Sequence, residues 1–133
     1  MILLDTHLWV WWVNGSSELS DEATRLIRSN ENDGIAVSII SCWEVAKKVE
    51  VGKLALDRDV ADWIESALAY PGVRLIDLTP RIVVESTRLP QPLHRDPADQ
   101  LIVATSRVLG VPLLTADERL IRYEHVVKAT GQR

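Results

Sequence analysis

The chain has 133 residues, of which 47% are hydrophobic and 26% are charged, and its formal net charge is −4 at pH 7. This length fits a single domain, residues 1–133, and the composition excludes a disordered or low-complexity protein. The acidic balance argues against a general nucleic-acid binder, which normally carries a basic surface. It leaves open an enzyme whose bound cations meet a phosphate.

Neither a membrane span nor a secretory leader is expected. No apolar stretch reaches the ~18 residues that a membrane span requires, and the start of the chain lacks the basic region of a signal peptide. The single cysteine, Cys42, excludes an internal disulfide and is interpreted as a small hydrophobe rather than a reactive thiol. These features predict a cytoplasmic protein.

Short apolar runs alternate along the chain with segments of helical periodicity and with turn signals. In chain order, the predicted elements are a strand 2–5, a helix 7–13, a helix from Ser20 to the break at 32–34, a strand 35–39, a helix from Ser41 to about Val51, a helix from Asp57 or Asp59 to the stop at 70–72, a strand 73–78, a helix 79–89, a helix 96–109, a strand 111–115, a helix 117–123 and a candidate edge strand 126–128. Strands that alternate with helices indicate parallel pairing with right-handed crossovers. We therefore expect an α/β fold with three layers, α/β/α, and a mainly parallel sheet of about five strands.

Four acidic residues lie where an apolar run stops or where the next helix starts: Asp5, Glu44, Asp99 and Asp117. Ligands bind outside the carboxyl ends of the strands in an open parallel sheet, so these carboxylates should gather at one edge. Two unit charges ~4 Å apart repel each other by about 4 kcal/mol at an effective dielectric constant of about 20. A hard divalent cation relieves this repulsion, and Mg²⁺ or Mn²⁺ suits carboxylate and water ligands best. The pattern predicts a metal-dependent site that cleaves phosphodiester bonds.

Most of these acids also have a structural interpretation as helix caps. Ser41 and Glu44 match the capping box, in which the acid bonds back to the cap backbone. Asp96 precedes a proline and is a good N-cap, which would make Asp99 a favourable acid in the first turn. Asp117 could cap the helix that follows it. Each of these acids, taken singly, therefore fits a cap as well as a ligand.

The joint pattern favours a functional interpretation. Asp5 closes a buried strand and has little capping role unless it caps the next helix itself. Elsewhere the chain uses the hydroxyls of Ser20 and Thr79 as predicted caps. The two interpretations are compatible, because the N-terminus of a helix helps to keep a carboxylate ionised.

The segments around these acids resemble the PIN-domain ribonucleases, specifically the VapC-type toxins of bacterial toxin–antitoxin pairs. The segments that carry the resemblance are Leu3–His7 with Trp11–Trp12, Ser38–Val45, Lys48–Leu54, His94–Ala104 and Leu114–Asp117. Together they span essentially the whole chain. The specificity lies in their combined order and spacing, since no single segment is distinctive.

The resemblance implies a PIN fold and metal-dependent cleavage of RNA. By position, Asp5 and Asp99 would be the principal ligands of Mg²⁺ or Mn²⁺, and Glu44 and Asp117 would complete the catalytic acidic cluster. Asp96 is a further acid that either contacts the metal or only caps its helix.

Neighbouring polar residues have smaller expected roles. Thr6 and Thr115 would supply hydroxyl groups to a ligand or to a metal-bound water. His94 is interpreted as a hydrogen bonder in the connector before its helix. Gln100 stands where this branch of the family often has Arg, so the chain lacks a positive charge there but keeps the acids.

The resemblance also implies an RNA substrate and a VapB-type antitoxin whose C-terminal segment brings a basic residue to the acids. Trp9, Trp11 and Trp12 cannot share one narrow helix stripe, and we interpret them as core plus a homodimer patch rather than as platforms for base stacking. The basic residues that cluster modestly along the chain are interpreted as solvated helix faces. They are Arg25, Arg28, Lys47, Lys48, Lys53, Arg119 and Arg122.

Three other classes of protein would share parts of this pattern. A phosphoacceptor receiver domain needs paired acids after the first strand, but Asp5 is followed by Thr6. A haloacid-dehalogenase-type phosphatase needs an aspartate at the position of His7. A catalytically inactive PIN-like binding module remains an alternative, and an assay of metal-dependent RNA cleavage distinguishes it from the enzyme.

Overall fold

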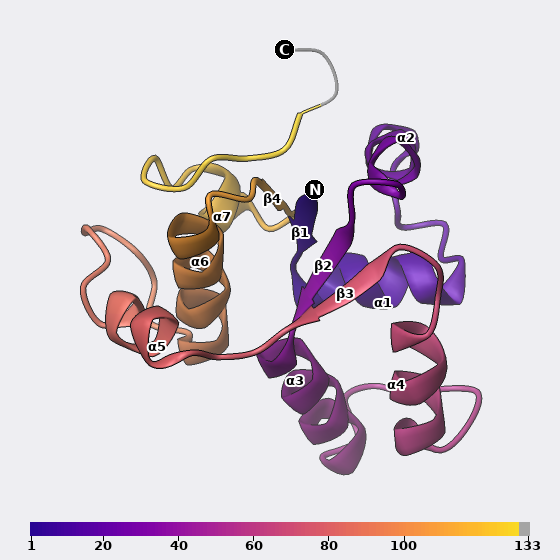
Figure 1. Cartoon of the computed structure of the whole chain (residues 1–133). Helices are drawn as coiled ribbons and strands as arrows, with labels where there is room; N and C mark the ends of the chain where they lie inside the picture. The colour runs from indigo at the N-terminus through magenta and orange to yellow at the C-terminus, as the bar shows by residue number, and fades with distance from the viewer. Residues whose placement is uncertain (131–133) are drawn as a thin grey trace.

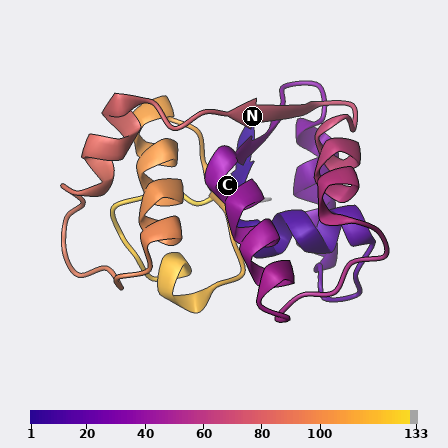
Figure 2. The same ribbon diagram turned by 90° about the horizontal axis from the view of Figure 1, so that it is seen from below.

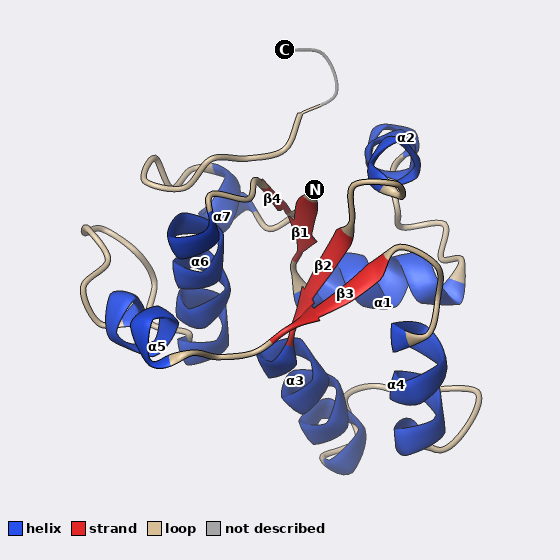
Figure 3. Ribbon diagram, in the orientation of Figure 1, coloured by secondary structure: helices blue, strands red, loops and turns tan. Residues whose placement is uncertain are grey.

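In the computed structural model, residues 1–130 are described and form four strands and seven helices (Figure 1). In chain order these are β1 (Ile2–Leu4), α1 (Thr6–Asn14), α2 (Asp21–Asn30), β2 (Ile35–Ser38), α3 (Ile39–Glu50), α4 (Val60–Leu68), β3 (Val73–Ile76), α5 (Pro80–Ser86), α6 (Pro97–Leu109), β4 (Leu113–Leu114) and α7 (Glu118–Ile121). The strands are ordered β3-β2-β1-β4, and every neighbouring pair is parallel (Figure 3). The predicted α/β fold with a parallel sheet is confirmed.

Strands β1, β2 and β4 are buried on both faces, whereas the edge strand β3 is partly exposed. Successive side chains of a strand point to opposite sides of the sheet. Ile2 and Leu4 of β1 belong to one core cluster, whereas Leu3 belongs to the other. Side chains of α1, α2 and α4 pack into the first cluster, and those of α6 and α7 into the second. Figure 2 shows these two groups of helices on either side, with α3 between them. The chain therefore has the predicted α/β/α layers.

The helix after β2 begins earlier than predicted, and this overturns one interpretation of Glu44. Ser38 ends β2 and caps α3, since its Oγ accepts a hydrogen bond from the Ile40 N–H at 3.1 Å. Ser41, the predicted cap, lies inside α3 and is fully buried. The apolar pair Ile39–Ile40 forms the first helical turn instead of extending the strand. The predicted capping box of Ser41 and Glu44 is therefore wrong.

The candidate edge strand at 126–128 is reduced to a single parallel bridge between Leu113 and Lys128. The Leu113 N–H donates to the carbonyl of Val127 at 2.9 Å, and the Ala129 N–H donates to the carbonyl of Leu113 at 2.8 Å. Because β4 has only two residues, a neighbouring strand can form few backbone hydrogen bonds with it. This accounts for four strands where about five were expected.

The tryptophans of α1 have different environments. Trp9 is fully buried and packs edge-on against Trp63 of α4, with ring centroids 5.1 Å apart. It therefore belongs to the core and not to a homodimer patch. Trp11 and Trp12 are half-buried against the same core. The most exposed indole is that of Trp43 on α3, 56% exposed.

Two further expectations concern Cys42 and the membrane. Cys42 is half-buried against the first core cluster, and this burial raises the pKa of its thiol, the opposite of what a reactive thiolate needs. Within residues 1–130, none of the helices has the length and apolar character needed to cross a bilayer.

Candidate active site

Polar side chains meet beyond the ends of β1, β2 and β4. Asp5 directly follows β1 and caps α1, since its Oδ1 accepts a hydrogen bond from the Leu8 N–H at 2.9 Å. Its Oδ2 accepts a hydrogen bond from the hydroxyl of Thr115, which directly follows β4. Only 3% of Asp5 is exposed. Two donors from different elements therefore hold this carboxylate in one orientation.

Glu44 reaches the same edge from the second turn of α3. Its Oε1 accepts a hydrogen bond from the hydroxyl of Thr6, the residue after Asp5. The Thr6 hydroxyl also lies 2.8 Å from the Oγ of Ser41. Thus Ser41, which was predicted to cap α3, instead supports the hydroxyl that holds Glu44.

Asp99 and Asp117 approach each other from the starts of α6 and α7. The Nε2 of His94 lies 2.7 Å from the Oδ2 of Asp99. His94, Asp99 and Asp117 each offer one potential ligand atom, and these atoms all lie within 4.8 Å of one another. The predicted hydrogen-bonding role of His94 therefore has a specific partner, one of the four acids.

Burial raises the pKa of three of the acids. Desolvation raises the pKa of Asp5 from its ordinary value of 3.8 to about 6, although its hydrogen bonds to Thr115 and Leu8 act in the opposite direction. Desolvation also raises the pKa of Glu44 and of Asp99. The negative charge of Asp99 contributes to the raised pKa of both Asp5 and Glu44. The carboxylates of Asp5, Glu44 and Asp99 are therefore close enough for the charge of Asp99 to act on the other two.

Asp117 differs from the other acids because it has an in-chain cation. The Nη2 of Arg119 lies 3.0 Å from its Oδ2, and this hydrogen-bonded ion pair holds the pKa of Asp117 below its usual range. The same guanidinium nitrogen lies 3.9 Å from the Oδ2 of Asp99. Within residues 1–130, Asp5 and Glu44 make no ion pair. The exposed Arg119 guanidinium therefore pairs with Asp117 and approaches Asp99, whereas Glu44, among the described residues, has only the more distant charge of Lys48.

Asp96 lies at the rim of the cluster and acts as a cap. Its Oδ1 accepts a hydrogen bond from the backbone N–H of Asp99 at 3.0 Å, and its side chain is otherwise exposed. Its charge still contributes to the raised pKa of Asp99 and Glu44. The geometry thus favours the capping interpretation of this residue over direct metal contact.

Two neighbours of the acids have contacts that the sequence did not reveal. Arg119 was interpreted as part of a solvated helix face, yet it bonds to Asp117. The signal available in the sequence was that Arg119 follows Asp117, the predicted cap of this helix, by only two residues. Gln100 donates from its Nε2 to the carbonyl of His94 at 3.2 Å, so it fixes the connector that carries the histidine.

The donor set fits a hard divalent cation. Within residues 1–130, the ligand atoms close enough together to share one ion belong to His94, Asp99 and Asp117, and Asp5 and Glu44 lie outside this group. Carboxylate and imidazole donors both suit Mn²⁺, whereas Mg²⁺ favours the oxygens. Asp5, Glu44 and Asp99 are partly or fully desolvated, and each ionises less readily than it would in water. A bound cation would favour their charged forms.

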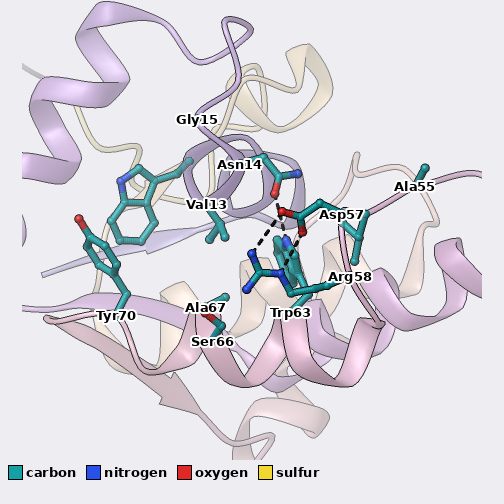
Figure 4. A pocket seen from close by; sticks show the side chains of 12 residues that line it. Val13, Asn14, Gly15, Ala55, Asp57, Arg58, Trp63, Ser66, Ala67 and Tyr70 are labelled. Carbon is teal, nitrogen blue, oxygen red and sulfur yellow. Dashed lines mark hydrogen bonds and ion pairs between the residues drawn. The ribbon is translucent and has the colours of Figure 1, made fainter.

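A large cavity lies away from these acids. It has a volume of about 650 Å³ and lies between the C-terminal end of α1 and α4 (Figure 4). On its wall the indole N–H of Trp63 donates to the Oδ1 of Asn14 at 3.0 Å. None of Asp5, Glu44, Asp99 or Asp117 lines it. We assign the candidate active site to the acidic cluster and not to this cavity, because the cluster holds the carboxylates that can bind a cation.

Replacing Thr115 by Val should raise the pKa of Asp5 above about 6. The Thr115 hydroxyl bonds to the ionised carboxylate and lowers its pKa, and Val keeps the shape of Thr without the donor. A ¹³C NMR titration of the Asp5 carboxyl in EDTA measures the change. Thr105→Val is the matched control, because buried Thr105 donates only to the Leu101 carbonyl within α6. An Asp5 pKa that is the same or lower in Thr115→Val would contradict the assigned contact.

A parallel α/β sheet with carboxylates at its carboxyl edge fits more than one class of protein, so comparison with known sequences decides between them. The sequence model of the PIN domain matches residues 2–126, and the chain belongs to the PIN-domain family. It is 34% identical to Ribonuclease VapC22 of Mycobacterium tuberculosis (strain ATCC 25618 / H37Rv) over 124 residues, which are 93% of this chain and 92% of that relative.

Solved structures agree in fold. The chain is similar to the VapBC2 complex from Rickettsia felis bound to a promoter DNA fragment, with a TM-score of 0.71, 18% identity and coverage of 97% of this chain and 98% of that chain. It is also similar to a toxin–antitoxin complex from Klebsiella pneumoniae, with a TM-score of 0.62, 18% identity and coverage of 96% and 97%. At these identities the likeness concerns the fold alone.

Proposed function

We propose that the chain is an endoribonuclease that hydrolyses RNA phosphodiester bonds with Mg²⁺ or Mn²⁺ and acts as the toxin of a toxin–antitoxin pair. The observation that carries the proposal is the convergence of Asp5, Glu44, Asp99 and Asp117 at one edge of the sheet. Membership of the PIN family and the likeness to a VapC ribonuclease support it.

In this proposal Asp5 and Asp99 hold the cation, and Glu44 and Asp117 complete the site. When bound, the cation would stabilise negative charge on the phosphate and make a nearby water more acidic. The Asp5 carboxylate is kept in place by the Leu8 N–H and the Thr115 hydroxyl. Glu44, held by Thr6, orients the attacking water and accepts its proton, a role suited to its raised pKa.

His94 and Asp96 have positioning roles in the same scheme. The His94 imidazole fixes the Asp99 carboxylate at 2.7 Å, and hydrogen bonds of this kind tune metal ligands. Asp96 caps α6 and thereby fixes the backbone of Asp99.

The proposal includes two protein partners, both within a cytoplasmic context. A VapB-type antitoxin would neutralise the acids with a basic residue, and the solved relatives that include toxin–antitoxin complexes support this choice. A homodimer would bury exposed apolar side chains, of which Trp43 is the most exposed aromatic. We propose that residues 1–133 act as one domain in these assemblies.

Cleavage of RNA by the purified chain tests the proposal. We expect discrete products from total RNA in MnCl₂ and none when EDTA is added. Because a water, and not the 2′-hydroxyl, attacks the phosphorus, the products should carry no 2′,3′-cyclic phosphate. The absence of a 2′,3′-cyclic phosphate distinguishes the expected reaction from cleavage by a contaminating metal-independent ribonuclease that attacks through the 2′-hydroxyl. A chain that cleaves no RNA with Mg²⁺ or Mn²⁺ would favour the alternative, an inactive PIN-like binding module.

A further inference from the structure

A small cavity adjoins the acids on the side of α1 and α3. It has a volume of about 120 Å³, and its wall includes Thr6, His7, Trp11, Lys48 and Lys53. We call this cavity the Lys48 pocket. Thr6 belongs to both sites, because its hydroxyl donates to Glu44. Lys48 follows Glu44 by one helical turn, about 6 Å along the axis, so the pocket begins where the acidic site ends.

The pocket contains basic groups that make no ion pair with a carboxylate in residues 1–130. The Nζ of Lys48 lies 3.4 Å from the Nε2 of His7. Throughout residues 1–130, neither Lys48 nor Lys53 has a carboxylate oxygen within ion-pair distance. Lys47, next to Lys48 on the same helix, is instead paired with Glu50 on the helix surface. The charge of Lys48 acts to lower the pKa of Glu44, but neither lysine is held in an ion pair, so both ammonium groups can contact an external anion.

A glycine turn brings the second lysine back beside the first. Gly52 has a φ of +79°, in the left-handed region that favours glycine. The backbone N–H groups of Lys53 and Leu54 both donate to the carbonyl of Lys48, at 2.8 and 3.2 Å. This fold-back explains why the segment Lys48–Leu54 forms one wall of the pocket.

We infer that the Lys48 pocket binds a backbone phosphate of the RNA strand, adjacent to the phosphate that is cleaved. The inference rests on the proposed ribonuclease function. Phosphate contacts fix the register of a nucleic acid on a protein, and a chain of net charge −4 must supply them from local cations. Lys53 is exposed and Lys48 is half-buried, so this assignment adds a proposed role to two residues that were interpreted as solvated surface charges.

An RNA phosphate suits the pocket better than an acidic peptide of a partner protein. The pocket shares Thr6 with the carboxylate cluster, so an anion bound there lies close to Glu44. A cation held by the acids would offset this repulsion for either anion, but a lone peptide carboxylate fills the pocket alone, whereas RNA carries a phosphate at every nucleotide and can occupy both sites. An RNA strand crosses both sites, and a cation held by the acids would attract its neighbouring phosphate.

Fluorescence anisotropy with a labelled, mixed-sequence, single-stranded 12-nucleotide RNA tests the inference in low salt and CaCl₂, because Ca²⁺ also binds carboxylate oxygens. Gel electrophoresis of the recovered RNA verifies that it stays intact during the measurement. Lys48→Gln should raise the Kd about fivefold. It should also reduce the slope of log Kd against log salt by about 0.7, the loss of one phosphate contact. Lys48→Arg should retain most of the affinity. Lys47→Gln is the matched control and should change the Kd by less than about twofold.

The outcomes separate this inference from the proposed function. If wild type cleaves RNA in Mn²⁺ but Lys48→Gln matches Lys47→Gln in both Kd and salt slope, the phosphate assignment fails and the ribonuclease proposal stands. A pocket that instead receives an acidic peptide would give this same result. If the wild-type chain binds the RNA through Lys48 but does not cleave it, the ribonuclease proposal fails and the phosphate-binding role of the Lys48 pocket is supported. A wild-type chain that binds no RNA overturns the inference.

Discussion

The Asp5→Asn variant, kept free of metal by EDTA, is expected to be more stable than wild type at pH 7.5. Asp5 is almost fully buried, and burial raises its pKa from 3.8 to about 6. A shift of this size corresponds to about 3 kcal/mol of unfavourable free energy for the ionised folded state. Asn keeps the shape of Asp and its ability to cap α1 through the Leu8 N–H. We therefore expect a gain of about 1–3 kcal/mol in the free energy of unfolding.

The gain should depend on pH in one direction. Because the folded-state pKa of Asp5 is raised, the folded protein binds more protons than the unfolded chain between about pH 3.8 and 6. Wild-type stability therefore falls, relative to the variant, as pH rises through this window. The advantage of Asp5→Asn should be absent near pH 3.5 and complete above about pH 7.

Urea unfolding at several pH values measures this difference. Asp59→Asn is the matched control, because Asp59 also caps a helix, α4, but is exposed. The free energy of unfolding of Asp59→Asn should stay within about 0.5 kcal/mol of the wild-type value between pH 3.5 and 7.5. A destabilised Asp5→Asn variant at pH 7.5 would mean that the ionised carboxylate stabilises the metal-free fold. In the proposed function the stabilised variant should have lost its ribonuclease activity, a trade of activity for stability.

Asp99→Asn is expected to reduce RNA cleavage by about 100-fold or more, while Asp96→Asn retains activity within a few-fold. The two residues are three positions apart on the same first turn. Asp99 directs its carboxylate toward His94 and Asp117, whereas Asp96 uses its carboxylate on a backbone N–H. Asn caps a helix about as well as Asp, so only the first substitution removes a cation ligand.

Cleavage rates of the two variants in MnCl₂, with circular dichroism to verify folding, measure the contrast. Equal losses in both variants would give Asp96 a role in the reaction beyond capping. Full activity of Asp99→Asn would remove Asp99 from the mechanism. A folded, inactive Asp99→Asn beside an active Asp96→Asn is the expected result.

Local patterns in the sequence predicted most of the fold. Ser20 and Thr79 cap helices as expected, because each short polar side chain precedes a run with helical spacing. Of the two aspartates predicted to start the fourth helix, Asp57 and Asp59, it is Asp59 that caps it. The buried strands β1 and β2 were recognised as continuous apolar runs. Their order in the sheet, β3-β2-β1-β4, was not predicted, since register and neighbours depend on contacts between distant segments.

The acids were recognised individually, but their partners were not all predicted. The Ser41 prediction failed because the β-branched Ile39 was read as the end of the strand, although the buried Ser38 already stops the strand and caps α3. The contact of Arg119 with Asp117 depends on the short helix α7, which local pattern alone places only approximately. Trp9 was assigned a shared role with its neighbours because periodicity cannot identify which of three adjacent indoles meets Trp63.

Calorimetric titration of the metal-free chain with MnCl₂ tests the central claim, that distant acids form one cation site. We expect saturable binding by wild type, at least about 10-fold weaker binding by Asp5→Asn and by Asp99→Asn, and competition by Mg²⁺. The Asp59→Asn control should bind like wild type. Wild-type protein that binds no divalent cation, or variants that bind it with unchanged affinity, would contradict the account.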